Sequence, residues 1–342
     1  MRVLVAIAIA TVLAIVAIAV VPVLLLERAD DWRAYAEAAA ALLSGAPLYP
    51  WTGYPDIRAF GQHPYLYPPP LAAIWYVGLT AESFAVLKLG ALAGAMALLA
   101  RRSGAAWPWA MAVAIASITS SPAIHDAALG NVMALFAAAV AVSLADRGWG
   151  GSGALGVTCA VALKPALGPY LLWLLVRRRG SFGRAFAAGL ATTALFAILL
   201  GPGRYLEYLQ ALPKTAVLAA PFTGNLGLSA ISPALAIGGM AFAYAWTLGA
   251  AIRLDERSAA VVSLAMTQLA QPTIGLNYGV LLIPALVVLW TVDRRAAVAM
   301  ALVLPLVVIV SPVVAGLILA GAGTFAGIAG RRERRAPAAL SA

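Results

Sequence analysis

Long apolar stretches, separated by short polar segments that are rich in arginine, occupy most of this 342-residue chain. The first stretch, residues 3–26, is long enough to cross a bilayer as a helix. The others are 82–100, 106–124, 131–146, 184–200, 227–249, 258–271, 278–292 and a pair within 297–330 that is broken at Ser311-Pro312. In lipid each stretch must satisfy its own backbone hydrogen bonds, which favours helices. The pattern predicts an all-α, polytopic helical membrane protein.

Two longer segments interrupt this pattern. In 27–65, residues Asp31–Ser44 predict a short amphipathic helix that stops at Gly45, and the proline- and glycine-rich remainder, 46–65, predicts loop. A second segment, 201–226, is also rich in proline, glycine and aromatic residues and predicts another loop. Two ranges stay ambiguous. Residues 66–80 are about half a span, and 152–176 could form one long span or two short ones hinged at Lys164-Pro165.

Composition narrows the class of protein further. The chain is 63% hydrophobic and 11% charged, which excludes an ordinary soluble domain. A cleaved signal peptide is disfavoured for 1–26, because no small-residue cleavage pattern follows the apolar run. One cysteine, Cys159, excludes an internal disulfide framework, and two histidines exclude a multi-histidine metal site, so we expect neither a metal nor a cofactor. The net charge of +10 is scattered between apolar runs, so nucleic acid is not an expected partner.

The positions of the basic residues indicate a topology. If 66–80 does not cross the membrane and 152–176 is a hairpin, sixteen of the 23 basic residues face the cytoplasm, as the positive-inside rule favours. These are Arg2, Arg101, Arg102, Arg147, Arg177, Arg178, Arg179, Arg184, Arg253, Arg257, Arg294, Arg295, Arg331, Arg332, Arg334 and Arg335. The same topology places a set of polar residues together on the extracytoplasmic side, namely Asp31, His63, His125, Asp126, Asn131, Lys164, the 201–226 loop and Asn277.

Several polar residues are candidates for chemistry, and each has a plainer interpretation. Asp30 and Asp31 sit where a membrane helix would meet water, as a catalytic base for a lipid-carried substrate would, but they could equally cap the following helix. Lys164 lies within apolar sequence and needs an anion or a water-filled cavity. Lys88 is explained by a snorkelling side chain or an intramembrane pair, and His125-Asp126 by a turn with a capping aspartate. The crowd of aromatic residues between 32 and 76 is mostly interpreted as a belt at the membrane interface.

Several motifs together resemble glycosyltransferase family 87, whose members have the GT-C architecture. They are Asp31-Trp32-Arg33-Ala34-Tyr35 with Gly45-Ala46-Pro47-Leu48-Tyr49; Tyr67-Pro68-Pro69-Pro70-Leu71; Gly130-Asn131; Lys164-Pro165 before Arg177-Arg178-Arg179; and Pro272 before Asn277-Tyr278. The order and spacing of these motifs match the family over residues 30–290. Asn131 stands where the family has glutamine, and Asn277 where a histidine is usual.

The resemblance implies about 11–12 transmembrane helices, with juxtamembrane helices outside the cell, and transfer of a sugar from a polyprenyl-phosphate donor to a lipid-linked glycan acceptor. It implies Asp31 as the base, with Asp30 as substitute, and an inverting displacement. Donor-phosphate binding falls to Lys164, Asn277, Tyr278 and Arg33. Substrate binding falls to Tyr35, His63, Tyr67, His125 and Asn131. Mannose is the sugar that the family favours.

We therefore expect one transmembrane domain over 1–342 in the inner (plasma) membrane, with its active site facing out. It comprises a core module (1–200), the 201–226 loop, C-terminal helices (227–330) and a cytoplasmic tail (331–342). Three alternatives stay open: an arabinofuranosyltransferase of the same fold, a transporter or flippase for a lipid-linked sugar, and a non-catalytic membrane scaffold.

Overall fold

The computed structural model describes residues 30–54, 64–73, 78–145, 167–218, 225–271 and 274–335, and this part of the chain is helical, without strands. The predicted first span, 3–26, lies outside it, as do His63 and Lys164. The helices are α2 (Asp30–Ser44), η1 (Pro50–Gly53), α3 (Pro70–Ala73), α4 (Ala81–Arg102), α5 (Trp107–Ile118), α6 (Ser121–Leu129), α7 (Met133–Ala145), α9 (Gly168–Arg177), α10 (Arg179–Leu200), α11 (Pro202–Leu218), η4 (Leu228–Ala230), α12 (Pro233–Arg253), α13 (Glu256–Met266), η5 (Leu276–Leu281), α14 (Leu282–Val292), α15 (Arg294–Val310) and α16 (Pro312–Arg335).

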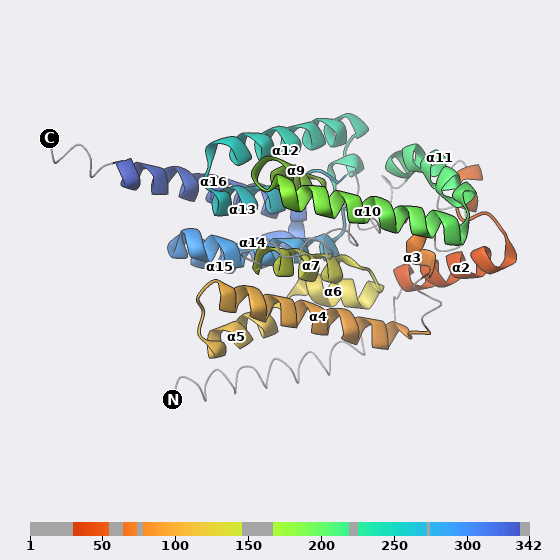
Figure 1. The fold of residues 1–342 in the computed structure, drawn as a ribbon, viewed down its shortest axis with the longest axis horizontal. Coiled ribbons are helices and arrows are strands. Elements are labelled where there is room, and N and C mark those ends of the chain that lie inside the picture. Colours follow the sequence, from red (N-terminus) through yellow and green to blue (C-terminus); the bar gives the residue numbers. More distant parts are fainter. Residues whose placement is uncertain are drawn as a thin grey trace.

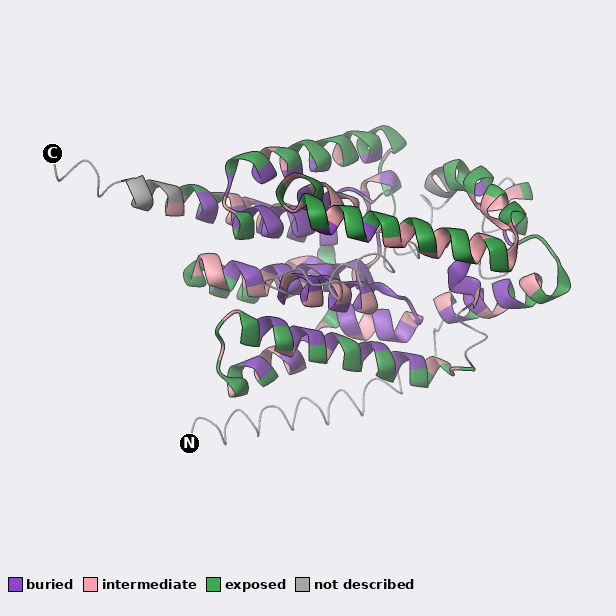
Figure 2. Ribbon diagram, viewed as in Figure 1, coloured by how far each residue is buried: buried purple, intermediate pink, exposed green. Residues whose placement is uncertain are grey.

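Four of the described helices are long and apolar enough to cross a membrane: α4, α10, α12 and residues Pro312–Gly330 of α16. Much of α10 and α12 is exposed (Figure 2), and leucine, isoleucine and phenylalanine are among their exposed residues. Only 6% of the apolar window of α10 is buried inside the protein. A surface of this kind is stable in lipid and not in water. The chain is therefore a helical membrane protein, as the hydropathy pattern predicts.

The helices pack around a common core. Helix α4 packs along α5 and α7, while α13 packs against α12, α14 and α16. Figure 1 shows α2, α3 and α11 gathered at one end of this bundle, away from the C-terminal end of α16. Arginine-bearing helix ends meet at the other end, where Arg177 donates a hydrogen bond to the carbonyl oxygen of Leu254 and Arg178 pairs with Glu256.

Two predicted elements differ from the structure. The expected single span 106–124 is two short helices, because Ser120 caps a new helix, α6, whose second residue is Pro122. The expected loop 201–226 contains α11, which starts at Pro202 and runs through Pro213. The predicted break at Ser311-Pro312 is confirmed, since α15 ends at Val310 and α16 begins at Pro312.

Candidate active site

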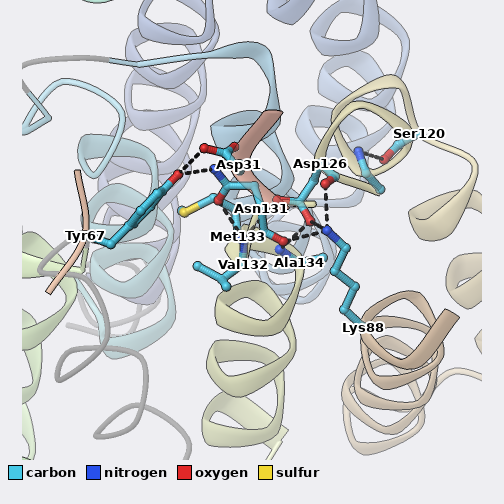
Figure 3. A network of polar contacts seen from close by, with 10 residues as sticks. Asp31, Tyr67, Lys88, Ser120, Asp126, Asn131, Val132, Met133 and Ala134 are labelled. Carbon is cyan, nitrogen blue, oxygen red and sulfur yellow. Dashed lines mark hydrogen bonds and ion pairs between the residues drawn. The ribbon is translucent and has the colours of Figure 1, made fainter. Parts of the chain in front are cut away.

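The centre of the candidate site is the carboxylate of Asp31, in the first turn of α2 and half-buried. The Tyr67 hydroxyl donates a hydrogen bond to one carboxylate oxygen at 2.6 Å, and Nδ2 of Asn131 donates to the other at 2.8 Å. The same Nδ2 lies 2.9 Å from the Tyr67 hydroxyl. Figure 3 shows the three side chains converging from separate segments. Two donors on one carboxylate stabilise its ionised form and fix its orientation.

The Tyr67 hydroxyl stays protonated at ordinary pH, since it donates to Asp31 while it accepts from Nδ2 of Asn131. Burial raises the pKa of its hydroxyl well above the usual range, and the negative charge of Asp31 raises it further. Its position is set by the loop around it. The Tyr49 hydroxyl donates to the Tyr67 carbonyl oxygen at 2.7 Å, and the Trp51 indole donates to that of Tyr65 at 2.9 Å. Three prolines follow Tyr67 and stiffen its connection to α3.

The turn between α6 and α7 positions Asn131. Gly130 ends α6 in the left-handed region, with φ +74°, and a Cβ there would lie 2.7 Å from Cβ of Trp32. Glycine is thus needed for both the backbone conformation and the close approach of α2. The Asn131 Oδ1 accepts the Val132 amide at 2.7 Å, which leaves Nδ2 directed at Asp31.

A buried ion pair lies directly behind this turn. Nζ of Lys88 is 3.0 Å from Oδ2 of Asp126, and both side chains have 0% exposure. The ammonium also donates to the carbonyl oxygens of Asp126 at 2.6 Å and Asn131 at 2.5 Å. The Asp126 carboxylate accepts the amides of Met133 and Ala134, at the start of α7. Of the two interpretations of Lys88, the ion pair is confirmed. Asp126 is a capping residue as expected, but it lies on helix α6 instead of in a turn and caps the start of α7.

Aromatic side chains form the inner wall of the site. The Tyr35 ring lies edge-on to that of Tyr67, with centroids 5.2 Å apart, and Trp32 stacks on Phe84 at 5.1 Å. Tyr35, Trp51, Tyr49, Tyr65 and Trp32 are at most 5% exposed. The interpretation of these residues as an interfacial belt is wrong for this set, because they pack on one another. Tyr54, at 43% exposure, is an exception.

The η5 segment packs against α6 and α7 and supplies two further predicted residues. Tyr278 is buried, and its hydroxyl is close enough to Tyr67 and Tyr35 to raise the pKa of both. Asn277 is 2% exposed, and its Nδ2 has no hydrogen-bond partner within the described segments. A buried amide N–H2 without a partner is costly, so Asn277 is a candidate to meet a ligand.

The remaining candidates are placed as follows. Asp30 and Arg33 are exposed on α2, on the side away from the buried cluster. His125 is half-buried on α6, next to Asp126. Helix α11 lies against the segment before η1, where Glu207 accepts the Leu48 amide at 3.0 Å. The sequence offered an ion pair for Lys88 but gave no sign that its ammonium also bonds to the backbone of Asn131, which in turn contacts Asp31.

The arrangement suits proton transfer. A half-buried, oriented carboxylate can accept a proton from a hydroxyl placed on its open side. Among the described residues, no three histidine, cysteine, aspartate or glutamate side chains are grouped so that they could hold a metal ion. No family model, no curated protein and no solved structure matches this chain.

Proposed function

We propose that the chain is an integral membrane glycosyltransferase of GT-C type, which moves a sugar from a polyprenyl-phosphate donor to a hydroxyl of a lipid-linked glycan. One observation carries the proposal. Residues that carry the family resemblance come together from four distant segments. Tyr67 and Asn131 bond to the Asp31 carboxylate, the Tyr35 ring contacts that of Tyr67, and Tyr278 interacts electrostatically with Tyr67. A set of motifs that serves one reaction would be expected to converge in this way.

In the proposed reaction, the oxygen of the acceptor hydroxyl bonds to the anomeric carbon of the sugar, and Asp31 accepts the proton of that hydroxyl. The bond from that carbon to the donor phosphate breaks, and the polyprenyl phosphate leaves with the electron pair. Direct displacement inverts the anomeric carbon, so a β-linked donor yields an α-linked product. Tyr67 and Asn131 hold the base in one orientation, which lowers the entropic part of the barrier.

The growing charge on the leaving phosphate needs donors or cations. Asn277 and Tyr278 are the described candidates, with Lys164 expected to supply the cation. Arg33, exposed on α2, is placed to meet a phosphate only from outside the buried cluster. Mannose is the proposed sugar, by resemblance to the family.

The proposed membrane orientation follows from charge. The arginine-rich end of the bundle would lie in the cytoplasm, and α2, α3 and α11 would lie on the extracytoplasmic surface. The donor phosphate of a polyprenyl lipid stays at the membrane interface. Asp31 lies at the end of the bundle that carries α2. In the proposed orientation this end is at the extracytoplasmic interface, where the donor phosphate would reach it.

The test is a transfer assay with the purified full-length chain in nanodiscs. Polyprenyl-phosphate mannose and arabinofuranose are offered with a lipid glycan extract, and donor consumption and product are followed. We expect Asp31→Asn to lower transfer at least about 100-fold, in the range for loss of a general base, with donor binding retained. Glu37→Gln, which removes an exposed carboxylate from the same helix, serves as the matched control and should keep nearly full activity.

Equal transfer by the wild-type chain and Asp31→Asn would exclude Asp31 as the base. Donor binding without any consumption by the wild-type chain, across the panel, would favour a scaffold. Movement of intact donor between leaflets would favour a transporter.

A further inference from the structure

A cavity of about 340 Å³ lies at the arginine-rich end of the bundle, away from Asp31. The ends of α4, α7, α9, α13 and α14 enclose it. Arg102, Arg178 and Arg257 line it, together with Glu256, Ser103 and Thr291. This volume is within the range of small-molecule sites.

The described lining residues carry an excess of positive charge over a nonpolar floor. They include three arginines and one carboxylate, and Glu256 forms its ion pair with Arg178. Leu99, Trp173 and Val288 form the buried floor, at 2%, 1% and 6% exposure. Arginines from different helices repel one another when they share a cavity, and an anion between them would offset that repulsion.

Two neighbouring arginines at the same end of the bundle, Arg101 and Arg177, bond to carbonyl oxygens of the protein. Arg101 donates to the Ala105 carbonyl oxygen at 2.6 Å and lies over the Trp107 ring, with 5.0 Å from its guanidinium carbon to the ring centroid. Arg177 is bonded to the carbonyl oxygen of Leu254. The Arg257 guanidinium, in contrast, makes no hydrogen bond or ion pair with the described part of the chain. An arginine that lines a cavity and has no protein acceptor is available to a ligand.

We propose that this cavity binds a phosphate group, carried either by an acidic phospholipid or by a soluble phosphorylated molecule. Guanidinium groups match phosphate oxygens in pairs of parallel hydrogen bonds, which lysine cannot do. Basic pockets between membrane helices are suited to phospholipid head groups, and the nonpolar floor would contact the glycerol or acyl part. The site is separate from Asp31, and the inference does not depend on the proposed transfer reaction.

The experiment uses the full chain in phosphatidylcholine nanodiscs, with two probes. Phosphatidic acid at a few per cent of the lipid is scored by native mass spectrometry of the released protein, and inorganic phosphate is scored by calorimetry. We expect Arg257→Gln to weaken binding about ten-fold, for one lost charge-assisted contact. Arg253→Gln is the matched control, because it removes an exposed arginine from the last turn of α12 that does not line the cavity.

A third variant, Thr291→Phe, fills the cavity without changing charge and should abolish binding. This variant is informative only if its unfolding temperature equals that of the wild-type chain. If it does not, Arg257→Gln alone decides the test. Binding of phosphatidic acid alone identifies a lipid site, and binding of inorganic phosphate identifies a soluble ligand. Binding of neither probe, or equal losses in Arg253→Gln and Arg257→Gln, overturns the proposal.

Discussion

The Lys88–Asp126 pair gives the sharpest test of the structure. Lys88→Met keeps the length of the side chain and removes its ammonium, which has bonds to the Asp126 carboxylate and to two carbonyl oxygens at 2.5–3.0 Å. Both side chains are fully buried, so the substitution leaves a charged carboxylate with no cation beside it. Breaking a buried pair from one side costs about 3–5 kcal/mol. We expect a loss of that size in the free energy of unfolding.

The measurement is equilibrium unfolding of the purified chain in bicelles, for example by steric trapping, which reports a free energy. Lys214→Met is the matched control. Its exposed ammonium donates one hydrogen bond, to the Thr52 carbonyl oxygen at 2.8 Å. The same substitution there should cost no more than about 1 kcal/mol.

A double variant separates the pair from general disruption. Lys88→Met with Asp126→Asn removes both charges, so the unpaired carboxylate is no longer present. We expect it to be no less stable than Lys88→Met alone, which is a strongly non-additive result. A Lys88→Met cost below about 1 kcal/mol, or costs of the two substitutions that simply add in the double variant, would refute the buried Lys88–Asp126 pair.

Two further predictions follow from the site. Gly130→Ala should lower the free energy of unfolding by at least about 2 kcal/mol, because the new methyl group adds a clash with Trp32 to the strain of a positive φ. The control Gly104→Ala, with φ +94° and open space around it, should cost only the backbone strain of about 1–2 kcal/mol. Equal losses of stability in the two variants would contradict this prediction. Burial raises the pKa of Tyr67 above its ordinary value of about 10, so above pH 10 the unfolded chain releases a proton that the native chain keeps, and stability falls as pH rises. Tyr67→Phe should therefore show a shallower loss of stability between pH 10 and 11, and a slope equal to wild type would count against this pKa shift.

Local signals predicted the elements that depend on local chemistry. The apolar run 82–100 became α4, which is capped at Thr80, and Ser311-Pro312 broke the last pair of helices. The same Ser-Pro signal was present at Ser121-Pro122, within a run that hydropathy alone joined into one span. Hydropathy reports how apolar a run is and not whether one helix continues through it. It therefore gave no sign of Ser120, which caps a new helix inside the apolar run.

Helix α11 shows the opposite case. Two prolines and two glycines in 201–213 predicted a loop, yet the segment is helical. Pro202 is tolerated because it lies in the first turn, whereas Pro213 lies inside the helix and costs it a backbone hydrogen bond. Tertiary contacts stabilise it, since Arg204 donates to the Ala46 carbonyl oxygen and Glu207 accepts the Leu48 amide. Those partners are about 160 residues away in the sequence, where no local pattern could reveal them.

The aromatic cluster was misread for a related reason. Tyrosine and tryptophan next to a membrane helix are compatible with an interfacial belt or a packed wall, and composition cannot separate the two. The hydroxyls of Tyr49 and Tyr65 and the indole of Trp51 bond to backbone carbonyl oxygens of the 65–68 loop. The cluster therefore serves to hold the loop that carries Tyr67, and this role became visible only with the loop in place.

The polar residues around Asp31 form a connected series of hydrogen bonds that runs from the buried Lys88 to the half-buried Asp31. Lys88 donates to the backbone carbonyl oxygen of Asn131, and the side-chain amide of Asn131 donates to Asp31. The Asp126 carboxylate pairs with Lys88 and accepts the Met133 amide at the start of α7. A buried ion pair adds little net stability compared with a nonpolar pair of the same size, because both charges lose their hydration. We infer that its benefit lies in position, since three directed bonds from one ammonium define the α6–α7 turn more closely than nonpolar packing would. The proposed role of Asp31 as a base requires its carboxylate to meet a hydroxyl at hydrogen-bond distance, and a precisely held α6–α7 turn would serve that role.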